Sequence, residues 1–318
     1  MAAHGQMLDA ARVSAERRHG RTHPAERTLE VEKVRVAFQG EAGAFSEAAA
    51  VQLYGENIVT VPRPTFDATF RAITEGHADA VLVPVENSLA GSVVRVYDLL
   101  LESEFTITAE TILPIEMNLI GCAGASLSEI RSVSSHPMAL AQCERFFGQH
   151  PSIKRLPAED TAGSVREMLA RGDRTHAAIA GKYAADRYRG EIIAERIQDN
   201  AENFTRFVFL QPVKEPTRAL TLKTLLESSG SHLMKMTLAI RLAHRPGSLL
   251  ASLEPLAQHR VNLLKIESRP IHGQPWEYQF FIDLEAPASY LEDALTDLRK
   301  ATREVRVLGL YAAAQNPP

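Results

Sequence analysis

Five short segments of the sequence place glycine, hydroxyl, amide and carboxyl groups at the junctions between predicted strands and helices. They are Gly40–Ser46, Val83–Ser92, Ser134–Cys143, Glu159–Ser164 and Glu202–Phe209. Open α/β sheets usually bind ligands at such junctions, and a helix N-terminus directs backbone N–H groups towards an anion. These segments therefore predict a site for a small anionic ligand that is held by hydrogen-bond donors.

Several other kinds of chemistry lack the residues that they need. The Gly40–Ser46 loop has neither the three spaced glycines of a dinucleotide fingerprint nor the lysine of a phosphate loop, which disfavours a nucleotide site. No His-Glu-x-x-His pattern and no nucleophile elbow occurs, so metal hydrolase and serine hydrolase chemistry have no support. The two cysteines, Cys122 and Cys143, are too few for a disulfide framework or a four-ligand zinc site.

Each segment also fits an ordinary structural role when it is taken alone. Gly40–Ser46 fits a turn between a strand and a capped helix, and Asn87 belongs to a residue type that is common at caps and turns. Ser135 fits the N-cap of a helix that starts at Pro137, which places Gln142 about two turns into that helix. The functional interpretation therefore depends on the segments as an ordered set.

The stretch from Val34 to about Pro212 alternates short apolar runs with helical segments, which predicts a mixed α/β sheet with crossover helices. Val34, Val36 and Phe38 alternate along the first strand, and Thr65 fits a helix N-cap. Further strands are predicted at residues 58–61, 80–85, 105–109, 116–120, 177–180 and 204–210, and helices at about 44–54, 66–75, 91–101, from 137, and at 161–169.

Residues 213–232 are polar and rich in proline, serine and glycine, so they are predicted to form a linker. After it, strands are expected at residues 236–242, 261–266, 276–284 and 305–310, with helices at 246–257 and 290–300. This βαββαβ order is the ferredoxin-like arrangement. We therefore expect a second, smaller domain over residues 233–312, followed by a short tail at 313–318.

In this order, the five segments resemble the prephenate dehydratase family over about residues 33–212. The most specific pieces are Glu86–Asn87–Ser88 with Gly91, Ser135–His136–Pro137 with Gln142, Asp160–Thr161–Ala162, and Asn203–Phe204–Thr205–Arg206–Phe207. The second domain resembles the regulatory ACT domain that follows the catalytic domain in that family. Within it, Lys265–Pro270 matches the family's effector-site motif nearly letter for letter.

The resemblance implies an α/β catalytic domain with two lobes, similar to periplasmic binding proteins, and an active site in the cleft between the lobes. The implied reaction is the decarboxylative dehydration of prephenate to phenylpyruvate in phenylalanine biosynthesis, which needs no cofactor. Family analogy gives Thr205 the catalytic role of proton donor or hydroxyl activator. The substrate-binding residues that carry over are Asn87, Ser88, Ser135, Gln142 and Thr161, with Arg206 pairing either with a substrate carboxylate or with an acid such as Glu202.

The resemblance also implies feedback regulation by L-phenylalanine, bound at an interface between subunits of a homodimer or homotetramer. The effector-binding residues that carry over are Pro246, Gly247, Ser248, Leu249, Leu250, Asn262, Glu267, Ser268, Arg269 and Pro270. Ser248 stands where the family usually has alanine, which leaves the identity of the effector open. If the resemblance is set aside, the polar residues Glu267–Arg269 indicate only the end of an edge strand.

Two alternatives to prephenate dehydratase stay open. One is arogenate dehydratase, or dual activity, because Gly43–Ala49 leans towards sequences of arogenate-using relatives. The other is an amino-acid sensor without enzymatic activity, which would bind a ligand with the same two-lobed fold and signal through the ACT domain. The sensor predicts binding without turnover, and the intact Thr205–Phe207 segment argues against it.

Length and composition set the remaining limits. The 318 residues predict about two domains, and 45% hydrophobic residues provide material for a sizeable core. A net charge of -4 disfavours nucleic acid as a partner, and no apolar run approaches the roughly 20 residues of a transmembrane helix. Residues 1–32 lack the hydrophobic core of a signal peptide and are expected to form a disordered leader, so we expect a cytoplasmic protein.

Overall fold

The computed structural model describes residues 33–213, 233–271, 273–274 and 276–314. The predicted leader, the predicted linker after Val213 and the last four residues lie outside this part of the chain. The described strands form two sheets, a ten-stranded one with the order β13-β14-β12-β15-β5-β11-β3-β1-β2, in which β4 pairs with β3, and a five-stranded one with the order β10-β6-β9-β7-β8. No helix in the described ranges is long and apolar enough to cross a membrane.

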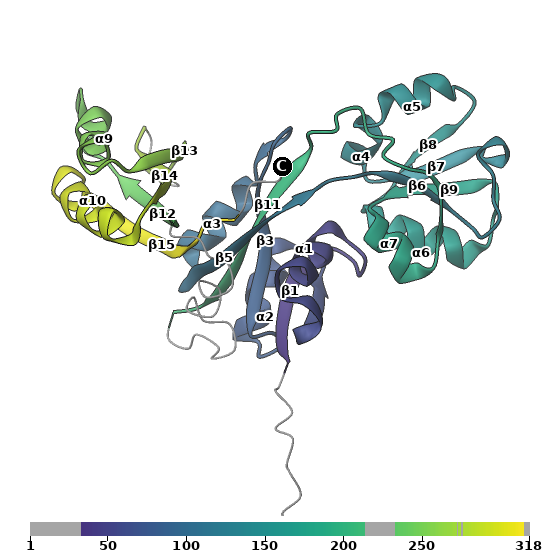
Figure 1. Cartoon of the computed structure of the whole chain (residues 1–318), viewed down its shortest axis with the longest axis horizontal. Helices are drawn as coiled ribbons and strands as arrows, with labels where there is room; N and C mark the ends of the chain where they lie inside the picture. The colour runs from purple at the N-terminus through teal and green to yellow at the C-terminus, as the bar shows by residue number, and fades with distance from the viewer. Residues whose placement is uncertain (1–32, 214–232, 272, 275, 315–318) are drawn as a thin grey trace, which may run out of the picture. The chain divides into compact units, whose positions relative to one another are not determined.

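The first lobe carries one part of the ten-stranded sheet, with helices on both faces (Figure 1). Its strands are β1 (Val34–Gln39), β2 (Ile58–Arg63), β3 (Ala80–Asn87), β4 (Gly91–Ser92), β5 (Phe105–Pro114) and β11 (Phe204–Pro212), and its helices are α1 (Phe45–Tyr54), α2 (Phe66–Thr74) and α3 (Val94–Glu102), with a 3₁₀ turn at Gly55–Asn57. Along β3, Ala80 and Leu82 pack on the α1 side, whereas Val81 and Val83 pack on the side of α2 and α3. Burial on both faces explains why this strand reads as a continuous apolar run.

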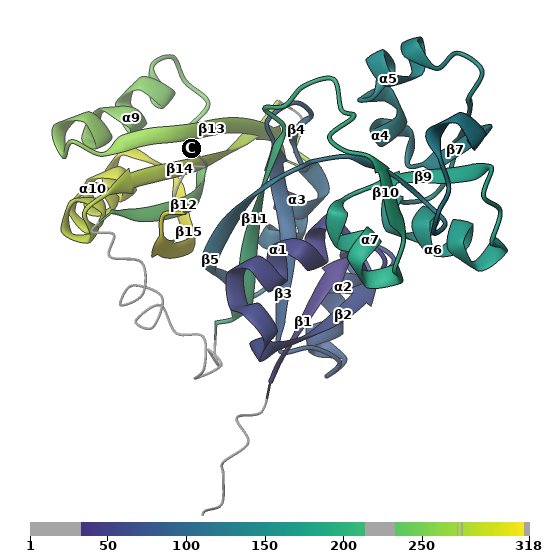
Figure 2. The same ribbon diagram turned by 45° about the vertical axis from the view of Figure 1, so that its right-hand side comes forward.

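The second lobe repeats this layering around the five-stranded sheet. Its strands are β6 (Asn118–Gly121), β7 (Ser132–Ser135), β8 (Lys154–Pro157), β9 (His176–Ala180) and β10 (Glu191–Ala194), and its helices are α4 (Pro137–Ala141), α5 (Glu144–Gln149), α6 (Thr161–Arg171) and α7 (Lys182–Tyr188), with a 3₁₀ turn at Leu127–Glu129. In both views, α4 and α5 lie on one side of the sheet and α6 and α7 on the other (Figures 1 and 2). Leu119 and Ile179 pack towards α4 and α5, and Ile120 and Ala178 pack towards α6 and α7.

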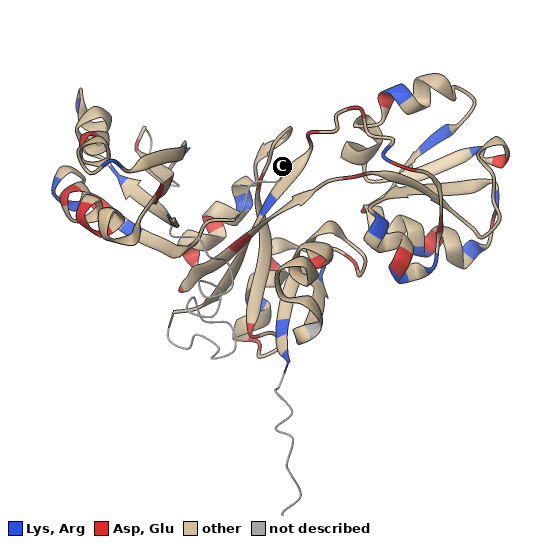
Figure 3. Cartoon of the chain, in the orientation of Figure 1, with Lys and Arg blue, Asp and Glu red and all other residues tan. Residues whose placement is uncertain are grey.

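The C-terminal domain has the predicted ferredoxin-like order βαββαβ. It consists of β12 (Met234–Arg241), α9 (Ser248–Gln258), β13 (Asn262–Pro270), β14 (Tyr278–Ala286), α10 (Ala288–Ala301) and β15 (Glu304–Ala312). Both helices cover the same face of the sheet, where they bury Met236, Leu238 and Ile240 of β12 (Figure 2). Acidic and basic residues both occur along α10, whereas Glu254 is the single charged residue of α9 (Figure 3).

The opposite face of this sheet packs on the first lobe. Ala239, Phe281, Leu308 and Tyr311 belong to the same buried cluster as Val81 and Val83 of β3. The backbone joins the two units where Gly309 of β15 pairs with Ile107 of β5 in parallel. The C-terminal domain is therefore continuous with the first lobe in both its core and its sheet.

The structure moves some predicted boundaries and adds elements. The helix predicted from residue 91 begins at Val94, because Gly91 and Ser92 instead form β4 and pair with Asn87 and Glu86. The N-cap prediction at Thr65 is confirmed, since its side chain accepts a hydrogen bond from the Ala68 backbone N–H at 3.1 Å. Four short strands, β4, β7, β8 and β10, were not predicted, because stretches of two to four residues carry little periodic signal.

We expect Gly309→Ala to destabilise the protein by about 1–3 kcal/mol, as overpacked cores do. A Cβ at this position would lie against the Ile107 carbonyl oxygen and 2.6 Å from Ile107 Cβ, where the two strands meet. The matched control is Gly148→Ala, because Gly148 lies in helix α5 with no atom within 4 Å of the added Cβ. Thermal unfolding should show a lowered Tm for Gly309→Ala alone. An unchanged Tm would contradict the close approach of β15 and β5.

Candidate active site

A cavity of about 420 Å³ is lined by residues of both lobes. The first lobe contributes Gln39, Gly40, Ala44, Phe45, Ser46, Pro84, Asn87, Ala90, Val93, Thr205 and Phe207, and the second contributes His136, Met138, Ala139, Gln142, Glu159, Asp160 and Thr161, with Ile115 and Met117 from the connection between the lobes. All five segments that the sequence singled out are represented. The apolar side chains suit a ring, and the polar groups suit carboxylates and hydroxyls.

A row of amide and hydroxyl groups crosses this cavity from one lobe to the other. Asn87 Nδ2 lies 2.9 Å from Thr205 Oγ1 and 2.7 Å from Asn203 Oδ1. Asn203 in turn donates through Nδ2 to Gln142 Oε1 at 3.2 Å. Because Asn87, Asn203 and Gln142 are joined in this way, the row fixes the position of Thr205 relative to the second lobe.

The hydrogen bond from Asn87 sets the polarity of the Thr205 hydroxyl. Thr205 Oγ1 accepts this bond, so its own hydrogen is left for a group in the cavity. The other end of the Asn87 side chain is occupied as well, since Oδ1 accepts from the backbone N–H groups of Leu89 and Ala90 at 3.0 and 2.9 Å. Asn87 is therefore held at both ends, and Thr205 is a positioned donor.

The N-terminus of α1 opens onto the cavity. This helix has no side-chain cap at Ala44, so the N–H groups of its first turn can meet an anion. The preceding loop is fixed by buried Glu47, which accepts from the Gly43 backbone N–H and from Thr60 Oγ1, each at 2.6 Å. Gly43 has φ = +90° and lies against α7, where a Cβ would come within 3.2 Å of Ala184 Cα. The glycine thus permits the turn that aims the helix.

The N-terminus of α6 lies on the second-lobe side of the cavity. Asp160 caps it by accepting from the Gly163 backbone N–H at 2.6 Å, and Thr161, the first residue of the helix, lines the cavity. Thr161 is thus placed where the sequence predicts a substrate-binding group. Glu159 and Asp160 add carboxylates on this side.

Two predicted substrate-binding serines have structural partners and are not among the cavity-lining residues. Ser88 Oγ donates to the Glu202 carbonyl and accepts from the Phe204 N–H, each at 2.9 Å, so it ties β3 to the start of β11. Ser135 is fully buried and donates to the Ile179 carbonyl at 2.6 Å. Its predicted role as the N-cap of the helix at Pro137 is wrong, because His136 is the N-cap residue.

The His136 imidazole accepts from the Met138 backbone N–H at 3.2 Å. This helix, α4, ends after five residues, so Gln142 is its C-cap residue rather than a residue two turns inside a longer helix. The short helix is what turns the Gln142 side chain towards Asn203.

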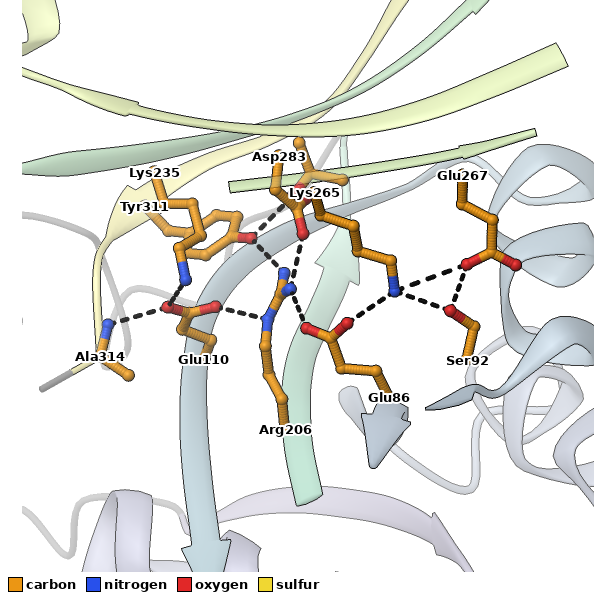
Figure 4. Close-up of polar contacts among 11 residues, drawn as sticks. Glu86, Ser92, Glu110, Arg206, Lys235, Lys265, Glu267, Asp283, Tyr311 and Ala314 are labelled. Carbon is orange, nitrogen blue, oxygen red and sulfur yellow. Dashed lines mark hydrogen bonds and ion pairs between the residues drawn. The ribbon is translucent and has the colours of Figure 1, made fainter. Parts of the chain in front are cut away.

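Arg206 lies on the other side of β11 from the cavity. Its guanidinium reaches Glu110 at 2.8 Å, Glu86 at 2.6 Å and Asp283 of the C-terminal domain at 2.5 Å (Figure 4). Of the two alternatives that the sequence left open, this geometry favours pairing with acids over pairing with substrate, although the acids differ from Glu202. The structure therefore does not place Arg206 with the other predicted substrate-binding residues.

Within the described lining of the cavity there is no lysine or arginine. Arg63 is the cation that comes near, since it lines an adjoining cavity of about 490 Å³ that shares Gln39, Gly40, Glu159 and Asp160 with the first. No group of three or more His, Cys, Asp or Glu side chains that could hold a metal ion occurs among the described residues. Within this cavity itself, the groups that suit an anion are neutral donors and helix N-termini.

The predicted effector residues are divided between separate places in the C-terminal domain. Ser248 and Leu249 line a cavity of about 160 Å³ beside Tyr278 and Phe280. Arg269 and Pro270 line a different cavity of about 830 Å³. Glu267 contacts the first lobe, where it accepts from Ser92 Oγ.

The other predicted effector residues lie on the same two elements. Gly247 is the N-cap of α9 in a left-handed conformation with φ = +79°, and Leu250 in the first turn of that helix is 76% exposed. Pro246 directly precedes this cap, and Asn262 and Ser268 lie on β13. One chain alone does not bring all these residues into a single cavity.

Asn203 lies inside one of the predicted segments but was not predicted as a site residue. Asn203 is 1% exposed, and it connects Asn87 to Gln142. The signal that could have found it is a carboxamide directly before a buried strand, where only a hydrogen-bonded side chain is tolerated.

Comparisons with known proteins agree with this geometry. A family model described as prephenate dehydratase matches residues 36–215, which contain every polar residue of the row. The chain belongs to the prephenate dehydratase family. Among curated members, it is 36% identical to arogenate dehydratase/prephenate dehydratase 2 of Arabidopsis thaliana, a match over 88% of this chain and 73% of that protein.

A second member of the prephenate dehydratase family gives a similar result. The bifunctional chorismate mutase/prephenate dehydratase of Aquifex aeolicus is 34% identical over 89% of this chain and 74% of its own length.

Two solved structures share the fold of this prephenate dehydratase family member. Prephenate dehydratase from Arthrobacter aurescens in complex with L-Phe is 33% identical, with a TM-score of 0.75 over 88% of this chain and 90% of that one. A protein described as a quorum-quenching acylase is 31% identical, with a TM-score of 0.76 over 88% and 98% of the two chains. Both matches extend beyond the catalytic lobes, so the two-lobed architecture with its C-terminal domain is shared.

Proposed function

We propose that this chain is a prephenate dehydratase, a lyase that converts prephenate to phenylpyruvate, carbon dioxide and water. The observation that carries the proposal is the hydrogen-bonded row Thr205–Asn87–Asn203–Gln142 at a cavity shared by two lobes, in a chain of this family. The reaction requires a donor for a leaving hydroxyl and an anchored dianionic substrate. Thr205 is the donor that this cavity offers with its oxygen already fixed.

In the proposed mechanism, the bond between the ring and its carboxylate breaks and its electron pair enters the ring. The ring hydroxyl leaves at the same time, takes a proton and departs as water. Thr205 donates that proton, and its oxygen recovers one from water after the products leave. Because a threonine hydroxyl is a weak acid, proton transfer accompanies C–O cleavage, and the Asn87 N–H stabilises the negative charge that develops on Thr205 Oγ1.

Substrate positioning falls to the groups around Thr205. We assign the carboxylates of the substrate to the N-terminus of α1 and to the donors Gln142 and Thr161, which line opposite sides of the cavity. Arg63 in the adjoining cavity supplies a cation for a side-arm carboxylate. Arogenate, which carries an ammonium group in the side arm, is the alternative substrate. The negative charges of Glu159 and Asp160 in the cavity lining would attract that ammonium group.

Regulation by L-phenylalanine is part of the proposal. The structural relative from Arthrobacter aurescens was solved with L-Phe, and Lys265–Pro270 of the C-terminal domain here resembles the effector-site motif of the family. Because one chain divides the predicted effector residues between two cavities, we propose that a second copy completes the site, in a homodimer or homotetramer. The β13 edge strand, which exposes Leu264 and Ile266, is the surface we assign to that contact.

The proposal includes the domain division and the location of the protein. The divisions are a leader at 1–32, a catalytic domain at 33–212, a linker at 213–232, a regulatory domain at 233–312 and a tail at 313–318. The family match over residues 36–215 supports the catalytic boundaries. A cytoplasmic location is supported by two free cysteines, which suit a reducing compartment.

Acylase chemistry, which the name of one structural neighbour suggests, has less support. Enzymatic acyl transfer commonly uses a nucleophile that is activated by a neighbouring base. The hydroxyls lining the described cavity belong to Ser46, Thr161 and Thr205, and none of them is hydrogen-bonded to a histidine or a carboxylate in the described residues. We therefore make no proposal of acylase activity.

The proposed function is tested by assaying the purified chain with prephenate and with arogenate, each with and without L-phenylalanine. We expect phenylpyruvate from prephenate and a lower rate when L-phenylalanine is added, since a coupling of about 1–3 kcal/mol between sites is ordinary. Phenylalanine formed faster from arogenate would favour the alternative substrate. Folded protein that turns over neither substrate would contradict the proposal and support the sensor.

Thr205→Ala should lower the turnover of prephenate by about 10²–10⁴-fold, the range for losing a positioned proton donor. Thr205→Ser keeps the hydroxyl and should retain most of the activity. Thr108→Ala is the matched control, because Thr108 lies on β5 of the same sheet and bonds only weakly to the Phe209 carbonyl, at 3.5 Å. Normal turnover by a folded Thr205→Ala variant would remove Thr205 from the chemistry.

A further inference from the structure

Two neighbouring cross-strand pairs join β3 to β11 on opposite faces of the sheet. In the strand register, Thr205 is opposite Asn87, and Arg206 is opposite Glu86. The first pair is bonded at the cavity at 2.9 Å, and the second is bonded at 2.6 Å on the face that meets the C-terminal domain. Successive residues of a strand point to opposite faces, and the two pairs are adjacent in the register, so a shift of β3 relative to β11 changes the spacing of both pairs.

The pair of Glu86 and Arg206 is held by the C-terminal domain. Asp283 of β14 accepts from Arg206 Nη1 at 2.5 Å, and Tyr311 of β15 contacts Arg206 Nη2 at 3.2 Å. Lys265 of β13 donates to Glu86 Oε2 at 2.7 Å. Figure 4 shows the guanidinium between these groups, with the Lys265 ammonium reaching across from the other domain.

A second layer fixes the same groups. Thr237 donates to Asp283 at 2.6 Å and is 2.7 Å from the Tyr311 hydroxyl. Lys235 donates to Glu110 at 2.6 Å, and Glu110 is the third carboxylate that Arg206 contacts. The core of this charge cluster therefore contains three carboxylates, Glu86, Glu110 and Asp283, and three cations, Arg206, Lys235 and Lys265.

The members of the charge cluster depend on one another for their charge. Burial raises the pKa of Asp283, but the charge and hydrogen bond of Arg206, the hydrogen bond from Thr237 and the charge of Lys235 together lower the pKa overall. Burial likewise raises the pKa of Glu86, and Arg206 and Lys265 lower it below its usual value. Removing one member leaves the remaining buried charges with fewer partners, which favours a shift of the strands that carry them or the entry of water.

Lys265 connects the charge cluster to the effector motif. It begins the Lys265–Pro270 motif, and its ammonium lies 2.8 Å from Ser92 Oγ and 3.6 Å from Glu267. Glu267 is itself a predicted effector residue and accepts from Ser92, which lies on β4 opposite Glu86. A ligand that moves this motif would therefore change the hydrogen bond and ion pair between Lys265 and Glu86.

We infer that Arg206 and Glu86 are positioning residues, and that the contact between Lys265 and Glu86 is the link through which the C-terminal domain sets the position of Thr205 and Asn87. The link rests on the proposed function for its effect on turnover. Its effect on the two strands is independent of that function. A conformational change in the regulatory domain thus affects Thr205 and Asn87 through the interstrand pair of Glu86 and Arg206.

The test is Lys265→Met, which keeps the apolar stem of the side chain and removes its charge. We expect kcat for prephenate to fall by about 5- to 10-fold with KM within about twofold, because the cavity and its anion donors are unchanged. Lys265→Arg should restore kcat. Inhibition by L-phenylalanine should weaken in Lys265→Met, while L-phenylalanine binding measured by calorimetry persists.

Hydrogen exchange supplies a readout that does not depend on turnover. The amides of residues 84–92 and 203–208 should exchange faster in Lys265→Met than in the wild type. The matched control is Lys300→Met, which removes an exposed lysine whose partner, Asp297, lies in the same helix. If Lys265→Met does not fold, Ser92→Ala weakens the same contact from the catalytic side and should show the same changes in smaller degree.

The outcomes separate this inference from the proposed function. Wild-type exchange in both segments together with wild-type kcat in Lys265→Met would overturn the link. A loss of kcat that Lys265→Arg does not restore would reduce Lys265 to a structural role and would also overturn it. Absence of turnover in the wild-type protein would refute the proposed function, and the exchange rates would still decide whether the link exists.

Discussion

The structure depends on the pairing of β3 with β11 at a single point in their register. Asn87 and Thr205 meet at the cavity, and one residue away Glu86 and Arg206 meet inside a buried charge cluster. The hydroxyl to which we assign the chemistry is therefore positioned by a strand whose next residue belongs to the contact with another domain. In the account proposed here, catalysis and regulation use the same short stretch of β3 and β11.

Burying this many charges carries a large desolvation penalty. This penalty explains why every charge of the cluster is paired. Removing one member of a buried ion pair costs about 3–5 kcal/mol, because the remaining charge keeps its desolvation penalty. Each charge of the cluster has at least one partner of opposite sign, and Thr237 and Tyr311 satisfy further positions of Asp283 and Arg206. An apolar interface would hold the domains together equally well. Ion pairs in addition fix the relative positions of the paired groups, so the loss of one contact disturbs the positions of the others.

The sequence predicted much of the fold and of the cavity, since these depend on local signals. The alternating residues of β12 and the cap at Thr65 are features of short windows, and the family motifs located Asn87, Gln142, Thr161 and Thr205. Long-range partners could not be predicted. The sequence around Arg206 does not predict its contact with Asp283. Asp283 comes close to Arg206 only when β14 packs on the first lobe.

The central claim is that the charge cluster acts through Thr205, and a double-mutant cycle on kcat for prephenate tests it most directly. The cycle combines Glu86→Gln with Thr205→Ala. If Glu86 works by placing the Thr205 hydroxyl, Glu86→Gln should lower kcat in the wild-type background and have little further effect once that hydroxyl is absent. Effects that multiply fully in the double variant would show that Glu86 and Thr205 act independently, and would contradict the account.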